Sequence, residues 1–137
     1  MQPIDWTNLY KIIIRNFDKS MHKHEVAKLL MVMKLVHRHN EKKGNLRVYT
    51  ERPITCNGKT RIADVYFENI ATREVYVYEV QKNFSKSWLE ETTEFYDSWI
   101  TSPGSLMYKS IDWFPIDLNK LSTDIVKMSE QLEEFIF

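Results

Sequence analysis

Two acidic residues and a glutamine mark the part of the chain whose residue types could do chemistry. Asp64 lies in the segment Arg61–Glu68, while Glu79 and Gln81 lie in the segment Glu74–Gln81. Two carboxylates that face each other repel, so they need either water beside a Lys or Arg, or a divalent cation between them. Mg²⁺ prefers oxygen ligands and is typically held by one or two carboxylates plus substrate phosphate. The residues are consistent with a metal site, and the solvated pair remains open as the alternative.

The geometry depends on the two segments forming a β-hairpin. Both are rich in Val, Ile, Tyr and Phe, which favour strands, and Asn69–Arg73 between them is a predicted turn. If Ala71-Thr72 forms the tip, Asp64 lies directly opposite Glu79, with Cβ atoms about 5 Å apart. Strand alternation then places Gln81 on the same face as Glu79.

The pattern Asp64…Glu79-Val80-Gln81, on a hairpin flanked by predicted helices, resembles the PD-(D/E)XK nuclease superfamily. This is the fold of many restriction endonucleases and archaeal Holliday-junction resolvases, and the resemblance spans about Ser20 to Leu118. It implies an α/β (α+β) fold with a restriction-endonuclease-like core of helix, three-stranded meander, helix and strand, in which helices flank a central mixed sheet. The chain departs from the pattern twice. Ala63 precedes Asp64 where Pro is common, and Gln81 replaces the usual Lys, which gives a Glu-x-Gln variant found in some restriction enzymes and competence-protein-like nucleases.

The resemblance implies metal-dependent hydrolysis of DNA phosphodiester bonds. Asp64, Glu79 and the main-chain carbonyl of Val80 are expected to hold Mg²⁺ or Mn²⁺, which polarises the phosphate and lowers the pKa of a bound water. In the usual motif a lysine stabilises the developing negative charge. Gln81 can donate a hydrogen bond there but brings no charge, and charge-assisted bonds are about twice as strong as neutral ones. Slower turnover is therefore expected unless Lys82 or Lys86 reaches the site.

Three further residues are candidates by the same resemblance, each with an open alternative. Glu25, at the head of a buried helical face, would help bind the metal or its water, or else complement the helix dipole. Glu51, on the first predicted strand, would be a metal ligand, or an edge-strand charge that discourages aggregation. Lys86, on the helix after Gln81, would supply the missing amine, or remain a solvated lysine near phosphate.

Contacts with nucleic acid are expected from local basic residues, because the 19 basic and 19 acidic residues balance. Phosphate contacts are predicted for Lys59, Arg61, Lys82 and Lys86, and for the basic end of the long helix at His37–Lys43. Such contacts orient a duplex without specifying its sequence. The pair His22 and His24 points about 200° apart on a helix, which argues against a shared zinc ion.

The periodicity of the chain predicts one domain over residues 1–137, with a core of about 20–118, an added N-terminal helix in 1–17 and a C-terminal helix in 119–137. The helices are predicted at Asp5–Phe17, Lys19–Lys42, from Ser85 or Ser87 to Thr101, and Ser122–Phe137. Besides the hairpin, a strand is predicted at Leu46–Ile54, ended by Pro53, with a tight turn at Cys56–Lys59. Leu106–Leu118 is predicted as a strand pair or one irregular strand, at an edge because of Pro115.

Composition places the chain among compact, ordered proteins, since 43% of its residues are hydrophobic and only three are Gly. The single Cys56 excludes an internal disulfide, and there is no recognisable signal peptide or membrane-length apolar run. A soluble intracellular protein is expected.

Three functions are weighed. The first is a nuclease, with a homodimer expected if both strands are cut. The second is a catalytically weak or inactive nuclease-like fold that binds DNA or a protein, an interpretation favoured by the zero net charge and Gln81. The third is a helical adaptor assembled through its terminal helices, which leaves the facing carboxylates unexplained.

Overall fold

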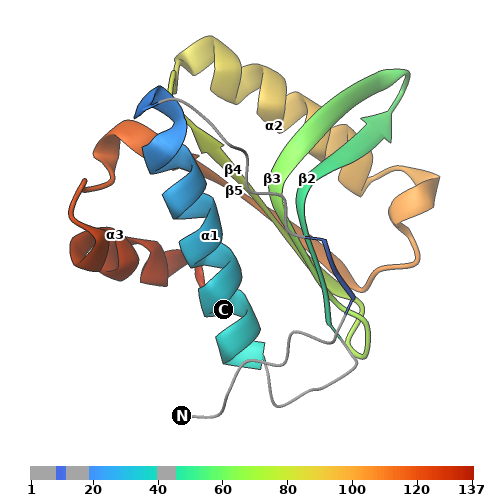
Figure 1. Cartoon of the computed structure of the whole chain (residues 1–137). Coiled ribbons are helices and arrows are strands. Elements are labelled where there is room, and N and C mark those ends of the chain that lie inside the picture. The colour runs from blue at the N-terminus through green and yellow to red at the C-terminus, as the bar shows by residue number, and fades with distance from the viewer. Residues whose placement is uncertain (1–8, 12–18, 40–45) are drawn as a thin grey trace.

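The computed structural model describes residues 9–11, 19–39 and 46–137 of the chain. In this part the strands are β1 (Leu9–Lys11), β2 (Leu46–Cys56), β3 (Lys59–Asn69), β4 (Glu74–Gln81) and β5 (Ser110–Asp117), and the α-helices are α1 (Lys19–His39), α2 (Lys86–Ile100) and α3 (Ile125–Leu132). Short 3-10 helices lie at Pro103–Ser105, Leu118–Lys120 and Glu133–Phe135. The helices α1 and α3 cover one face of the sheet and α2 covers the other (Figure 1).

The strands form one mixed sheet in the order β1-β2-β3-β4-β5. Neighbours β2, β3 and β4 are antiparallel, whereas β1 runs parallel to β2 and β5 runs parallel to β4. From α1 to β5 the order is helix, three-stranded meander, helix and strand. The predicted α+β class, a central mixed sheet flanked by helices, is confirmed.

Each face of the sheet has its own hydrophobic core. On one face α1, α3 and the C-terminal Ile136 pack against side chains such as Val65 and Tyr78. On the other face Phe95 and Tyr96 of α2 pack against the remaining side chains of the sheet. Most of β4 and the second half of β3 are buried on both faces because helices cover both sides of the sheet, so these parts lack the clean polar alternation of a half-exposed sheet.

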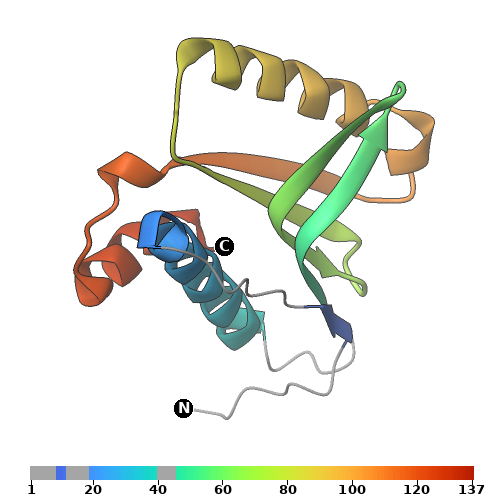
Figure 2. The ribbon, with the colours of Figure 1, turned by 45° about the horizontal axis from the view of Figure 1, so that its top comes forward.

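The β2–β3 hairpin changes face part of the way along. Val48 of β2 lies in the α1 core, whereas Ile54 of the same strand lies in the α2 core, although strict alternation would keep even-numbered residues on one face. The pairs Thr50–Val65 and Arg52–Ala63 flank the change. Glu51 sits between them with φ 53°, a left-handed conformation that is uncommon for a residue with a side chain. The half of the hairpin that contains its turn therefore bends toward α2 (Figure 2).

The β3–β4 hairpin has the predicted register over its paired length. Asn69 pairs with Glu74 next to the turn, and Val65 pairs with Tyr78 at the other end. The Asn69 side chain accepts a hydrogen bond from the Thr72 N–H at 3.1 Å, which is the turn-forming role expected of asparagine. The strand pairing of β3 with β4 ends one residue short of Asp64 and Glu79, because β3 turns away with the β2–β3 hairpin.

Two other local predictions are confirmed. Asn57 and Gly58 both have positive φ, 51° and 76°, in the two-residue turn that joins β2 to β3. The Ser85 side chain caps α2 by accepting a hydrogen bond from the Trp88 N–H at 3.1 Å.

The N-terminal helix predicted over Asp5–Phe17 is wrong at Leu9–Lys11, which forms the strand β1 beside Arg47–Tyr49 of β2. The rest of that range lies outside the described residues, as do Gly44 and the predicted last turn of the long helix. Pairing with a strand far along the chain outweighed the local helical spacing, as tertiary context often does.

The prediction that Pro53 ends the first strand is also wrong, because β2 continues to Cys56. β1 pairs with β2 only at Arg47–Tyr49, so Pro53 lies where no described strand covers the outer side of β2. A proline at such an edge loses no ladder hydrogen bond. Likewise Pro115 lies in an edge strand, β5, and Leu106–Leu118 contributes a single strand rather than a pair.

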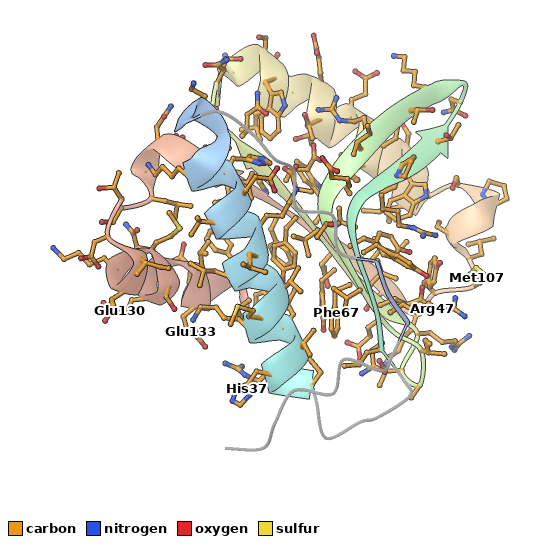
Figure 3. The ribbon with its side chains drawn as sticks, in the orientation of Figure 1. His37, Arg47, Phe67, Met107, Glu130 and Glu133 are labelled. Atoms are coloured by element: carbon orange, nitrogen blue, oxygen red, sulfur yellow. The ribbon has the colours of Figure 1, made fainter. Side chains whose placement is uncertain are left out.

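The C-terminal segment is helical over a shorter range than the predicted Ser122–Phe137. Asp124 caps α3 through the N–H groups of Val126 and Lys127. Glu133 lies beside α1 and forms ion pairs with Lys34 and Arg38 (Figure 3). Among the described helices, none is long and apolar enough to cross a membrane.

Candidate active site

Asp64 lies at the point where β3 separates from β4, and two elements hold its carboxylate. Oδ2 accepts a hydrogen bond from the Val80 N–H at 2.7 Å, which replaces the ladder bond that the diverging strands cannot make. Oδ1 lies 3.2 Å from Nε2 of His24 on α1. This hydrogen bond with Asp64 raises the pKa of His24, so the imidazole tends to carry the proton that neutralises the carboxylate.

Glu79 is buried on β4 and approaches the α2 layer. Its Oε2 lies 3.7 Å from Nη2 of Arg61, and the buried Tyr96 hydroxyl approaches the carboxylate without reaching good hydrogen-bond geometry. Burial first, and then the negative charge of Asp64, raise the pKa of Glu79 to about 7, although Arg61 and Tyr96 oppose the rise. At neutral pH Glu79 is therefore only partly ionised.

Asp64 and Glu79 open into one pocket of about 460 Å³. They reach it from different sides, since Asp64 is held by α1 and Glu79 is held beside α2. The pocket lies where β3 separates from β4, and residues of α1 and α2 also line it. The polar residues lining the pocket are His24, Thr60, Arg61, Asp64, Glu79 and Gln81, and the apolar ones are Ile62, Val80 and Trp88.

The candidates Glu25 and Glu51 lie in a neighbouring buried cluster around Lys28, and neither lines the pocket. Lys28 is 1% exposed, and its Nζ lies 2.6 Å from Oε2 of Glu25 and 3.9 Å from Oε1 of Glu51. The ammonium group thus offsets the charge of both glutamates where the resemblance implies a cation. His24 lies between the two groups, with its Nδ1 4.0 Å from Oε1 of Glu25.

The basic residues predicted near the motif are spread around the site. Gln81 lines the pocket, but its amide donates a hydrogen bond to the Asn83 carbonyl at 3.2 Å. Lys86 is 90% exposed on α2, and its Nζ lies 3.9 Å from Glu90 on the same helix. Lys82 is exposed, and Lys59 lines a separate pocket between the β2–β3 hairpin and α2. Of the four predicted phosphate contacts, Arg61 is the one that lines the pocket with the two carboxylates.

Sequence reasoning missed His24, Thr92 and Tyr96 as site residues. The sequence suggests His24 only as a zinc ligand. Its place next to the candidate Glu25, near the start of the helix, was the available signal. Thr92 carried a usable signal, since it is a polar residue one turn from Phe95 and Tyr96, and it is fully buried with them against the sheet. It accepts a hydrogen bond from Arg61 Nη2 at 2.6 Å and donates one to the Trp88 carbonyl at 2.7 Å.

Within residues 9–11, 19–39 and 46–137, no group of three or more His, Cys, Asp or Glu side chains is arranged to hold a metal ion. The two carboxylates of the pocket are the acidic groups that the described residues bring together there. Comparison of the chain with protein-family models, curated proteins and solved structures found no match.

Proposed function

We propose that this protein is a metal-dependent nuclease that hydrolyses DNA phosphodiester bonds, with Asp64 and Glu79 as the ligands of Mg²⁺ or Mn²⁺. The observation that carries the proposal is the placement of both carboxylates in one pocket, where burial first, and then the charge of Asp64, raise the pKa of Glu79. An acidic pair with a raised pKa is typical of functional sites, because residues with perturbed pKa values are concentrated there.

The donor set fits the proposed ion. Carboxylate oxygens are hard ligands, and Mg²⁺ is usually bound by one or two of them with water and substrate phosphate completing its shell. Val80 lines the same pocket, and its main-chain carbonyl would be a third oxygen ligand, as the resemblance to PD-(D/E)XK nucleases implies. When bound, the ion would polarise the scissile phosphate and lower the pKa of a water molecule.

The residues of the chain have separate tasks in this reaction. His24 and the Val80 N–H orient Asp64, while Arg61 positions Glu79. The oxygen of water bonds to phosphorus, the bond from phosphorus to one ester oxygen breaks, and that oxygen leaves as an alcohol with a proton from the water. One water is consumed for each bond cut, and no oxidant is needed.

The fold supports the proposal in its order of elements. Helix α1, the β2-β3-β4 meander, α2 and β5 follow the order of a restriction-endonuclease-like core, and the pocket lies where the meander opens. A homodimer belongs to the proposal as the arrangement that would let two such sites cut both strands of a duplex.

The alternative is a nuclease-like fold that binds DNA or a protein without cutting. Two observations favour it. Arg61 pairs with Glu79, so one of the two carboxylates already has a positively charged partner, and Gln81 is uncharged. Binding of DNA that does not depend on Mg²⁺ or Mn²⁺, without cleavage, would support this alternative.

Plasmid and branched DNA incubated with a series of Mg²⁺ and Mn²⁺ concentrations tests the proposal. Wild-type protein should cut, and both Asp64→Asn and Glu79→Gln should lower the rate by about 100-fold or more, because each removes a ligand charge. Asn keeps an acceptor for the Val80 N–H, so Asp64→Asn disturbs the backbone little. Asp97→Asn, on the exposed side of α2, is the matched control and should cut normally. Cleavage that survives in Asp64→Asn would overturn the proposal.

A further inference from the structure

The position that normally carries a lysine lacks a positive charge in this chain, and the nearby lysines do not replace it. Gln81 is neutral, and its amide is engaged with the Asn83 carbonyl. Lys86 points to Glu90, while the Lys82 main chain is held by Asn119, whose side chain donates to the Lys82 carbonyl at 2.6 Å. Neither lysine is among the residues that line the pocket.

Arg61, in contrast, lines the pocket, and its guanidinium group is held from several sides. Nη2 donates a hydrogen bond to Thr92 Oγ1 at 2.6 Å and lies 3.7 Å from Glu79 Oε2. The guanidinium carbon lies 5.9 Å from the centre of the Phe95 ring. Thr92 is itself fixed by its bond to the Trp88 carbonyl, so the arginine is positioned by both β4 and α2.

We infer that Arg61 is a catalytic residue that contacts the scissile phosphate and supplies the positive charge missing at Gln81. The inference rests on the proposed nuclease function. A guanidinium group carries five N–H donors, and both polar contacts described above use Nη2. The remaining donors suit two phosphate oxygens, which arginine binds in a bidentate manner.

The physical role of Arg61 is to stabilise charge, not to move a proton. Negative charge grows on the phosphoryl oxygens as water attacks, and a fixed cation in a partly buried pocket stabilises that charge more than water does. The guanidinium group stays protonated throughout, so the hydrolysis remains balanced as described above. Arg61 also attracts Glu79, which means that it competes with a metal ion for this carboxylate.

The competition with a metal ion predicts opposite effects on turnover and on metal binding. Arg61→Gln should lower kcat by about 100-fold, the usual cost of removing one charge-stabilising donor. At pH 8.5 the same variant should bind Mn²⁺ at least as tightly as wild type does. A merely structural role would weaken both. Arg61→Lys keeps the charge and should lose less than Arg61→Gln.

A second substitution tests whether the charge itself matters. Adding Gln81→Lys to Arg61→Gln places an ammonium at the usual motif position and should restore kcat by about tenfold or more, since the donor is again charged. Arg73→Gln makes the same change at an exposed position in the β3–β4 turn, and this control should cut like wild type.

The experiment measures steady-state cleavage of plasmid DNA, which gives kcat, and Mn²⁺ binding by calorimetry, at a temperature where far-UV circular dichroism shows every variant folded. If Arg61→Gln does not fold, Arg61→Lys takes its place, with an expected loss in kcat of about tenfold. Wild-type rates in Arg61→Gln, or equal losses of kcat and Mn²⁺ affinity, would overturn the role of Arg61 and leave the nuclease proposal standing. No cleavage by wild type under any condition would overturn both.

Discussion

Glu79 shows how strongly the surroundings of one residue decide its chemistry. The same carboxyl group on a solvated strand would be ionised at any pH above its ordinary pKa of 4.5. Burial between the sheet and α2, next to Asp64, raises its pKa to about 7, while Arg61 and Tyr96 limit the rise. Glu79 thus titrates close to neutral pH, where a bound divalent cation would displace its proton.

The raised pKa of Glu79 predicts a pH-dependent effect on stability. A carboxyl group whose pKa is higher in the folded state favours folding fully below the unfolded pKa, and this contribution is lost as the pH rises through the folded value of about 7. Glu79→Gln cannot ionise, so it should be more stable than wild type at pH 8, by at most about 3 kcal/mol, and similar at pH 4.5. Urea unfolding at both pH values measures the difference. An equal difference at the two pH values would contradict the assigned cause.

At the scale of elements, the decisive feature is the change of face in the β2–β3 hairpin. Glu51, with φ 53°, allows the strand to leave the α1 core and join the α2 core. Because of the same change, the pairing of β3 with β4 ends at Val65 and Tyr78. The next residues, Asp64 and Glu79, line the pocket that lies there. Strain of this kind often gathers near functional sites.

Strands usually favour a β-branched residue over glycine, and the left-handed conformation of Glu51 predicts the opposite order at this position. Glu51→Val should be less stable than Glu51→Gly by about 1–3 kcal/mol, because a β-branched side chain is disfavoured at positive φ. Both variants lose the contact with Lys28 equally, so their comparison isolates the backbone. At Thr55, an exposed position further along the same strand, the order should be reversed, with Val more stable than Gly. Thermal unfolding of the four variants checks this, and the same order at both positions would contradict it.

At the scale of the molecule, the last helix completes the core that supports α1, and α1 in turn carries His24 toward Asp64. Met128 and Leu132 of α3 are buried with α1 and the sheet, and the Tyr78 hydroxyl donates a hydrogen bond to the Phe135 carbonyl at 2.7 Å. The ion pairs of Glu133 with Lys34 and Arg38 lie at the surface, where such pairs add little. Apolar burial therefore holds the C-terminal segment in place.

A matched pair of substitutions on α3 tests this account. Leu132→Ala should cost about 2–5 kcal/mol of unfolding free energy, because Leu132 is 0% exposed and its removal leaves a cavity. Val126→Ala, at a position 63% exposed on the same helix, should change stability by less than about 0.5 kcal/mol. Urea denaturation gives both values. Similar small losses in both variants would mean that α3 is not part of the main core.

Several parts of the fold followed from local residue types. Asn57-Gly58 predicted the first hairpin turn, Asn69 predicted the second, and Ser85 was one of two serines predicted to start α2. These residues form turns and caps through their own backbone freedom or side chains. The candidate site was predictable only in part. Asp64 and Glu79 do line one pocket, but a metal ion between them stays a prediction, and their regular opposite placement assumed an unbroken strand alternation that Glu51 interrupts.

The amino-acid sequence alone determined the order of elements from α1 to α3, the register of the β3–β4 hairpin and which residues could do chemistry, because periodicity and turn residues act over a few neighbours. Only the tertiary structure decided that Leu9–Lys11 adds a strand, that Lys28 offsets Glu25 and Glu51, and that Arg61 and His24 reach the two carboxylates. Apart from Glu25 and Lys28, which are three residues apart on α1, these contacts join residues far apart in the chain. They depend on how the sheet bends between its two helical layers. No local pattern encodes that bend.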